Sequence, residues 1–287
     1  MTDVIIIGAG CAGLTAAIYA QRAGLSTILL EENFYGGQIA ISNEIENYPA
    51  IPSITGPELA QQIYAQAESL GAQIRFETVT QAELSANPKV VTTHTERYEA
   101  KAVIIANGVK RRKLGCPGEE AFTGRGVSYC ATCDAFFYRG KDVAVLGSGE
   151  YALHEAQALL PVAKSVTLLA NGQPLTAEFP AEVAVRPEKV EAILGEQRVS
   201  GVQLAGGETV ALDGVFVALG VAGSTALARK LGAEVDGNRI VTDAHMMTTL
   251  PGLYAAGDCT GGLLQVAKAV YEGALAGSEA AKALRKG

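Results

Sequence analysis

The sequence has no apolar run long enough to cross a membrane. A transmembrane helix needs about 20 consecutive, mostly apolar residues, and no stretch of this chain reaches that length. The start, Met1-Thr2-Asp3, shows no basic region followed by a signal core, so no export leader is expected. We therefore predict a cytoplasmic protein without membrane contact.

Cysteine and positive charge are scarce as well. Five cysteines with only one close pair argue against a secreted disulfide scaffold and favour a reducing compartment. Cys11, Cys116 and Cys259 are expected to be small packing residues. The single Cys-x-x-Cys lacks a second cysteine or histidine pair, so no metal site is expected. A net charge of −7 speaks against a nucleic-acid partner.

Glycine is plentiful, with 33 in 287 residues, and its first cluster lies between a strand and a helix. Val4–Ile7 predicts the strand and Leu14–Ala23 the helix. Gly8 would allow the tight turn, Gly10 would let the backbone approach a pyrophosphate, and Gly13 would let the helix pack closely on the strand. The pattern is typical of a dinucleotide-binding fold.

A carboxylate stands where such a fold holds a ribose. The predicted strand Thr27–Leu30 ends at Glu31, 23 positions after Gly8, which is near the spacing expected for a ribose contact. We predict that the three glycines and Glu31 bind a cofactor. The alternative, glycines that serve only a tight turn, stays open at this point.

The second half repeats the plan without the selecting residue. Asp142–Leu146 and Ser165–Leu169 predict strands around Gly147-Ser148-Gly149-Glu150-Tyr151-Ala152, with a helix continuing over Leu153–Leu160. The position 23 after Gly147 is Ala170, followed by Asn171. Neither supplies the carboxylate or arginine that selects NAD or NADP. Side chains from elsewhere in the chain remain an alternative source of these contacts.

The chemistry lies between the two folds, at Cys130-Ala131-Thr132-Cys133-Asp134. Two cysteines three apart lie one turn apart on one face of a helix, so a disulfide can close between them. At a helix N-terminus one thiolate is stabilised by the helix dipole. Asp134 is a candidate proton shuttle for the departing thiolate, with an ordinary helix-turn carboxylate as the alternative.

The carboxyl-terminal segment carries the Gly-Asp turn that flavoproteins use. In Gly252–Cys259 the turn is Gly257-Asp258, and Asp258 would take the ribityl hydroxyls of a flavin. A long helix is predicted over Leu264–Leu284. Its start, at Gln265 and Val266, would direct its positive end at the flavin pyrimidine ring.

The predicted fold class is α/β, with two Rossmann-like, three-layer domains, the second inserted into a discontinuous first domain. We place the FAD-binding domain at residues 1–113 and 243–287, and a degenerate NAD(P)H-binding-like domain with the redox pair at residues 114–242.

These motifs resemble, in order, the low-molecular-weight bacterial thioredoxin reductases. The resemblance covers essentially the whole chain, and it implies FAD, a homodimer and reduction of the thioredoxin disulfide. Cys133 would be the thiol next to the flavin, Cys130 the one that attacks thioredoxin, and Asp134 the proton shuttle. The segments that carry the resemblance are Gly8-Ala9-Gly10, Gly36-Gly37-Gln38, Glu46-Asn47-Tyr48-Pro49, the Cys-Ala-Thr-Cys-Asp string and Gly257-Asp258; among them Gly37, Gln38 and Asn47 are further candidate cofactor contacts.

The chain departs from that family's pattern where NADPH would bind. NADPH-using members usually carry His-Arg-Arg after the second strand of this domain, where this chain has Ala170, Asn171 and Gly172. Leu264 replaces the usual arginine before Gln265. The combination resembles the ferredoxin-dependent flavin thioredoxin reductases, so we expect ferredoxin as the electron donor.

Other functions stay open on sequence alone. They are an ordinary NADPH-dependent thioredoxin reductase, a flavin dithiol oxidase, and a non-enzymatic redox sensor. The basic run Lys110–Lys113 is read as a solvated linker, with a docking patch for an acidic ferredoxin as the alternative.

Overall fold

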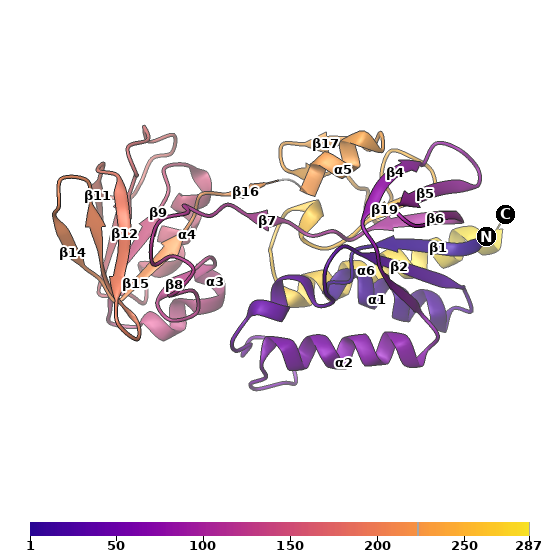
Figure 1. Ribbon diagram of the computed structural model, residues 1–287, viewed down its shortest axis with the longest axis horizontal. Coiled ribbons are helices and arrows are strands. Elements are labelled where there is room, and N and C mark those ends of the chain that lie inside the picture. The colour runs from indigo at the N-terminus through magenta and orange to yellow at the C-terminus, as the bar shows by residue number, and fades with distance from the viewer. Residues whose placement is uncertain (223, 287) are drawn as a thin grey trace. The chain divides into compact units, whose positions relative to one another are not determined.

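A computed structural model describes residues 1–222 and 224–286 of the chain, and its contacts divide the chain into two units (Figure 1). Unit 1 comprises Met1–Lys110 and Gly223–Gly287, and unit 2 comprises Arg111–Ala222. The first crossing is near the predicted Lys113. The second lies well before the predicted Asp243, because Ala228, Leu231 and Ile240 are buried in a core cluster of unit 1.

Unit 1 is built on a seven-stranded sheet of order β3-β2-β1-β6-β5-β4, with β19 pairing with β6 as well. The pairs β3·β2, β2·β1, β1·β6 and β19·β6 are parallel. The pairs β6·β5 and β5·β4 are antiparallel. The strands are β1 (Thr2–Ile7), β2 (Thr27–Glu31), β3 (Gln73–Phe76), β4 (Val79–Glu83), β5 (Lys89–Thr93), β6 (Arg97–Ile105) and β19 (Leu253–Ala255).

The apolar run of β1 follows from burial on both faces of this sheet. Val4 and Ile6 belong to one core cluster, whereas Ile5 and Ile7 belong to the cluster on the opposite face. Side chains alternate along a strand, so a strand covered on both sides reads as continuously hydrophobic.

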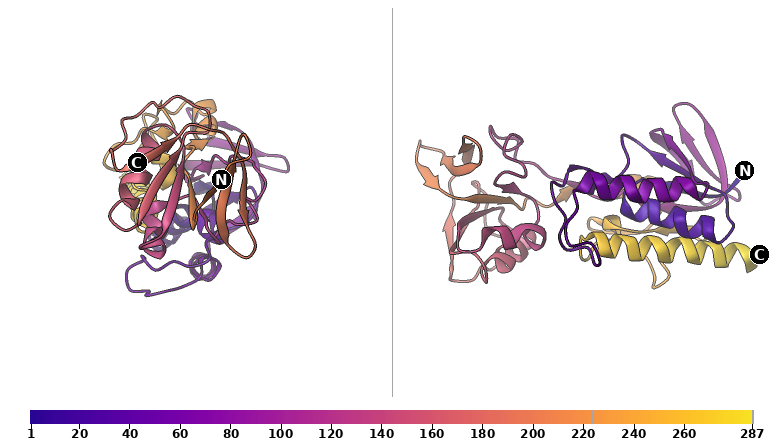
Figure 2. Two further views of the ribbon diagram at one scale, coloured as in Figure 1. Left: turned by 90° about the vertical axis from the view of Figure 1, so that its left-hand side faces the viewer. Right: turned by 90° about the horizontal axis from the view of Figure 1, so that it is seen from below.

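Three helices cover one face of the unit 1 sheet. They are α1 (Cys11–Arg22), α2 (Gly56–Ser69) and α6 (Val266–Lys286), which run side by side in the right-hand view of Figure 2. The other face carries α5 (Ser224–Lys230) and the hairpin of β17 (Val235–Asp236) and β18 (Arg239–Ile240). Short 3₁₀ turns, η1 (Gly37–Ile41) and η3 (Asp258–Thr260), lie in the connections.

Unit 2 has a parallel sheet of order β11-β10-β9-β15-β8 between two layers. One layer is a three-stranded antiparallel sheet, and the other holds the helices, as the two core clusters on opposite faces show. The elements are β8 (Val127–Ser128), α3 (Ala131–Asp134), η2 (Ala135–Tyr138), β9 (Asp142–Leu146), α4 (Glu150–Leu159), β10 (Ser165–Leu169), β11 (Val183–Arg186), β12 (Val190–Gly195), β13 (Val199–Leu204), β14 (Thr209–Ala211) and β15 (Gly214–Val217).

The chain passes between the units on two short paired strands, β7 (Lys110–Arg111) and β16 (Val221–Ala222). The α/β class with two layered, Rossmann-like units is confirmed. The predicted bounds of β9 and β10 match the structure, whereas the last helix begins at Val266 rather than at Leu264. Within the described residues, no helix is long and apolar enough to span a membrane.

Candidate active site

The first glycine turn joins β1 to α1 under tight packing. Gly8 has a φ of +107°, and a Cβ atom placed on it would stand 2.4 Å from the carbonyl oxygen of Ala106. A Cβ on Gly13 would stand 1.9 Å from the carbonyl oxygen of Gly8. Any larger residue at these two positions would push α1 away from the sheet.

The start of α1 fits a pyrophosphate. Gly10 occupies the N-cap position, no described side chain caps the helix, and its first turn carries no acidic residue. The first N–H groups of a helix need partners and attract anions. The Gly36-Gly37 loop lies against this turn, since the Gly36 N–H donates to the Ala9 carbonyl over 2.8 Å.

Glu31 lies at the end of β2 and reaches the same turn. Its Oε2 accepts a hydrogen bond of 2.8 Å from the Ala9 N–H, and its Oε1 accepts one of 3.0 Å from the Asn33 N–H. The carboxylate is therefore held at the edge of the glycine turn, where the sequence spacing placed it. Gln38 lies nearby in η1 and donates from Nε2 to the Val109 carbonyl over 3.4 Å.

The carboxyl-terminal segment completes this site. A Cβ on Gly257 would stand 2.8 Å from the Cβ of Ala12, so the Gly257-Asp258 turn packs on the start of α1. Asn47 Nδ2 donates to Gln265 Oε1 over 3.1 Å, which joins the predicted Asn47 loop to the residue before α6. The structure thus brings the predicted cofactor contacts of both chain segments to one end of the unit 1 sheet.

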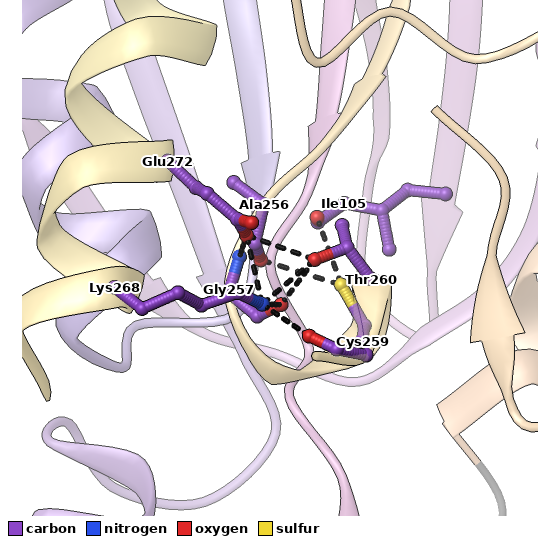
Figure 3. Close-up of polar contacts among 8 residues, drawn as sticks. Ile105, Ala256, Gly257, Cys259, Thr260, Lys268 and Glu272 are labelled. Atoms are coloured by element: carbon purple, nitrogen blue, oxygen red, sulfur yellow. Dashed lines mark hydrogen bonds and ion pairs between the residues drawn. The ribbon is translucent and has the colours of Figure 1, made fainter. Parts of the chain in front are cut away.

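An ion pair on α6 holds the Gly257-Asp258 turn (Figure 3). Lys268 Nζ donates to the carbonyl oxygens of Gly257 and Gly261, each over 2.7 Å, and lies 3.0 Å from Glu272 Oε2. Glu272 Oε2 also accepts hydrogen bonds of 2.8 Å from the Gly257 N–H and the Thr260 hydroxyl. Both side chains are largely buried, at 15% and 12% exposure.

Sequence reasoning missed this pair. The available signal was a lysine and a glutamate four residues apart, in the first turns of a helix otherwise rich in small residues. Such i, i+4 pairs usually lie on the solvent face of a helix, so the spacing alone did not indicate a buried clamp.

Unit 2 carries the redox pair on the short helix α3. Cys130 and Cys133 form a disulfide, and the Cys133 N–H donates to Cys130 Sγ over 3.2 Å. Cys130 is buried, at 8% exposure, whereas Cys133 is exposed. Beside them Phe136 and Phe137 are exposed at 67% and 40%, which leaves an apolar surface next to the disulfide.

Two carboxyl groups, the partly buried Asp134 and the buried Glu155, flank the disulfide. Asp134 Oδ2 accepts a hydrogen bond of 2.5 Å from the Ser128 hydroxyl, and Glu155 Oε2 on α4 accepts one from the Ala131 N–H. Burial raises the pKa of both groups, partly offset by Ser128 at Asp134 and by the Ala131 N–H at Glu155; the Arg111 charge opposes the rise at both. Burial thus favours the protonated form of Asp134, as a group that carries a proton requires.

The second glycine turn, between β9 and α4, is packed as closely as the first. Unlike the first turn, it has a threonine side chain lying against its second glycine. A Cβ on Gly147 would stand 2.5 Å from the Ala218 carbonyl oxygen. In front of the turn, the Thr176 N–H donates to the Ser148 carbonyl over 2.8 Å, and a Cβ on Gly149 would stand 3.0 Å from Thr176 Oγ1. Glu150 occupies the first turn of α4.

The position that would select a nucleotide is occupied by internal contacts. Ala170 is buried, at 2% exposure. Asn171 has a φ of +53°, and its Oδ1 accepts a hydrogen bond of 2.9 Å from the Val190 N–H. Its side chain therefore holds the start of β12.

The remaining cysteines and acids form no further redox or metal centre in the part of the chain that the structure describes. Burial raises the pKa of the Cys11 and Cys259 thiols to about 12. Cys116 is partly exposed and forms no disulfide. No cluster of three or more potential metal ligands occurs among the described residues.

Comparison with known proteins identifies the family. A model of the pyridine nucleotide-disulphide oxidoreductases matches residues 2–273. A thioredoxin reductase of Listeria monocytogenes is 40% identical over 98% of this chain and 93% of its own length.

Solved structures agree. The thioredoxin reductase of Streptococcus pyogenes superimposes with a TM-score of 0.94 at 38% identity, covering 100% of this chain and 99% of that one. The atypical thioredoxin reductase TRi of Desulfovibrio vulgaris Hildenborough gives 0.58 at 36% identity, with coverage of 100% and 99%. None of these three names states an electron donor. The chain belongs to the pyridine nucleotide-disulphide oxidoreductase family and, within it, to the low-molecular-weight thioredoxin reductases, which are FAD-dependent flavin disulfide oxidoreductases.

Proposed function

We propose that this thioredoxin reductase receives its electrons from reduced ferredoxin, a one-electron carrier, rather than from a pyridine nucleotide. The observation that carries the proposal is Thr176, which lies against the second glycine turn where a nucleotide pyrophosphate would bind. The electrons would then pass through FAD and the Cys130–Cys133 disulfide to thioredoxin.

The selecting position supports this reading. Asn171 accepts from the backbone of β12 through its Oδ1 and Ala170 is buried, so neither offers a carboxylate to a ribose hydroxyl or a positive charge to a 2′-phosphate. Charge-assisted contacts contribute roughly 1.5–3 kcal/mol each, or one to two decades of affinity. Beside this loop, Lys189 packs its aliphatic chain near Gly172, and the guanidinium of Arg186 pairs with Glu188 and Glu208.

The charge in front of the turn supports it as well. The open groove beside the turn has a volume of about 760 Å³, and its lining includes two carboxylates, Glu150 and Glu178, and no lysine or arginine. A pyrophosphate at the start of α4 would meet the Glu150 carboxylate at close range. Like charges at a helix N-terminus oppose anion binding there.

Within this function we assign the cofactor contacts to unit 1. The glycine turn and the start of α1 would receive the pyrophosphate, and Glu31 would receive the adenosine ribose. Asp258 would hold the ribityl hydroxyls, and the start of α6 at Val266 would face the flavin pyrimidine ring. The residues assigned are Gly8, Gly10, Gly13, Glu31, Gly37, Gln38, Asn47, Gly257, Asp258, Gln265 and Val266.

The redox roles are assigned to α3. Cys133 would exchange electrons with the flavin, Cys130 would attack thioredoxin, and Asp134 would move the proton. In the described conformation Cys133 is the more exposed cysteine, so Cys130 would reach thioredoxin only once the disulfide is reduced. We further propose that the protein acts as a homodimer. With its dithiol chemistry and three free cysteines, we place it in a reducing compartment, the cytoplasm.

An anaerobic titration tests the donor. NADPH, NADH and reduced ferredoxin are added separately to the oxidised holoenzyme while the flavin absorbance is followed, and photochemical reduction of the same sample shows that the flavin can be reduced. We expect ferredoxin to bleach the flavin and support thioredoxin reduction, and both nucleotides to act far too slowly for turnover. Rapid bleaching by NADPH with a micromolar apparent affinity would overturn the proposal.

A further inference from the structure

Glu155 is a buried carboxyl group that touches the redox tetrapeptide without belonging to its motif. It lies on α4 at 8% exposure, and its Oε2 accepts a hydrogen bond from the N–H of Ala131, the residue that follows Cys130. The neighbouring Cys133 N–H donates to Cys130 Sγ. The Glu155 carboxylate thus holds the peptide group between Cys130 and Ala131, next to the buried sulfur of Cys130.

The charges that face Glu155 come from three elements. Asp134 on α3 is a second carboxyl group, Arg111 on β7 supplies one guanidinium, and His154 precedes Glu155 on α4. When both carboxyl groups are ionised, negative charge exceeds the charge of Arg111 around the disulfide. Negative charge beside a thiol disfavours its thiolate.

We propose that Glu155 is a positioning residue that sets the nucleophilicity of Cys130 through its hydrogen bond to Ala131 and its negative charge. A flavin bound to unit 1 would supply two electrons to the Cys130–Cys133 disulfide; the S–S bond would break, and each sulfur would take up one proton from solvent to give the dithiol. The Cys133 N–H favours the thiolate of Cys130, while the Glu155 carboxylate opposes it. The balance of these two influences sets the fraction of Cys130 that is thiolate, on which the rate of attack depends.

Glu155→Gln separates the hydrogen bond to Ala131 from the negative charge. Its amide oxygen can still accept the Ala131 N–H, but the side chain carries no charge. If Glu155 only holds the tetrapeptide in place, Glu155→Gln should leave the ionisation of the Cys130 thiol unchanged. If Glu155 acts through its charge, Glu155→Gln should change that ionisation.

The test is the pH dependence of alkylation of the reduced holoenzyme by iodoacetamide, with Cys130 identified by peptide mass spectrometry. We expect Glu155→Gln to lower the midpoint pH of Cys130 alkylation by about one unit, a tenfold change in thiol ionisation. Glu150→Gln, on the same helix, removes an equal charge that no contact links to α3, and should leave the midpoint unchanged. Equal midpoints for Glu155→Gln and the parent would overturn the proposal.

Two further variants provide a second test and a control for the Glu155→Gln experiment. Glu155→Met removes the same charge with a flexible apolar side chain suited to a buried site, and carries the same expectation should Glu155→Gln not fold. Glu155→Asp keeps the charge, so its midpoint should stay close to that of the parent, and a fall as large as that of the glutamine variant would contradict a role for charge. The proposal concerns the disulfide alone and does not depend on the electron donor, so its failure leaves the ferredoxin proposal intact.

Discussion

The two strand–glycine–helix turns of this molecule have the same packing and differ in what lies in front of it. In both, the first glycine is held against a carbonyl oxygen, with hypothetical Cβ distances of 2.4 Å at Gly8 and 2.5 Å at Gly147. In unit 1 the first turn of the helix carries no acidic residue, and the Gly36-Gly37 loop and the Gly257-Asp258 turn lie beside it. In unit 2 the helix start carries Glu150, and Thr176 lies on the turn.

The difference shows that a glycine turn has two separable roles. The first glycine lets helix and sheet approach closely, and this role persists in unit 2 because the fold depends on it. The second glycine admits a ligand, and this role needs open space and a favourable charge. Unit 2 retains the first role and carries the disulfide at α3.

The largest effects are expected at that disulfide. Cys130→Ser and Cys133→Ser should each lower thioredoxin reduction by on the order of 10³-fold or more, because one sulfur cannot form or exchange a disulfide. Flavin reduction by the donor should persist in both, since it needs unit 1. Thioredoxin trapping assays check the roles: Cys133→Ser should form a mixed disulfide through Cys130. Parent rates in both variants would exclude the dithiol mechanism.

Alanine at one glycine of each turn compares the two units directly. Gly13→Ala places a Cβ 1.9 Å from the Gly8 carbonyl oxygen, so α1 must shift, and FAD affinity should fall by about 100-fold. Gly149→Ala meets only the Thr176 side chain, at 3.0 Å, so FAD content and donor rate should stay within about twofold of the parent. Flavin fluorescence on dilution measures the first and stopped-flow absorbance the second. A loss of donor rate above tenfold in Gly149→Ala would show that the second turn binds the donor.

Ion pairs of the two units offer a smaller contrast. Lys268→Met leaves Glu272 buried beside the Gly257-Asp258 turn without its cation, and should lower the stability of the apoprotein by roughly 1.5–3 kcal/mol and weaken FAD binding about tenfold. Lys164→Met in unit 2 removes an exposed pair with Asp142 and should leave the free energy of unfolding unchanged. Urea unfolding and flavin titration measure both. Equal losses in the two variants would mean that Lys268 does not clamp the turn.

Sequence reasoning predicted what depends on chain-local patterns. The strands and helices around both glycine turns and the α/β class follow from hydrophobic periodicity and glycine spacing, and the disulfide pair follows from the spacing of its cysteines. The bounds are less exact, because α1 begins at Cys11 rather than Leu14. Asn47 and Gln265, both predicted as cofactor contacts, also meet in space, although 218 positions separate them.

The missed features depend on how side chains pack across elements. The second domain crossing was placed too late because the apolar residues of α5 and β18 can serve either core, and only the packing assigns them to unit 1. Thr176 and Glu155 act on residues 28 and 24 positions away, and neither position carries a motif. Spacing along the chain cannot reveal contacts that a fold creates between loops.

The smallest expected effect compares stability with function at Asp134. Burial raises its pKa above the usual value for aspartate, so the folded state binds this proton more tightly than the unfolded state. The stability linked to the proton is therefore complete at low pH and is lost as pH rises through the raised pKa.

Asp134→Asn keeps an acceptor for Ser128 and removes the charge, so it should be more stable than the parent near pH 7, by less than about 1 kcal/mol, with the gain vanishing in acid. Urea unfolding from pH 4 to pH 8 measures the difference, and thioredoxin reduction should fall in the same variant because the proton carrier is gone. A stability gain that is constant across this range would show that the Asp134 charge is not the cause.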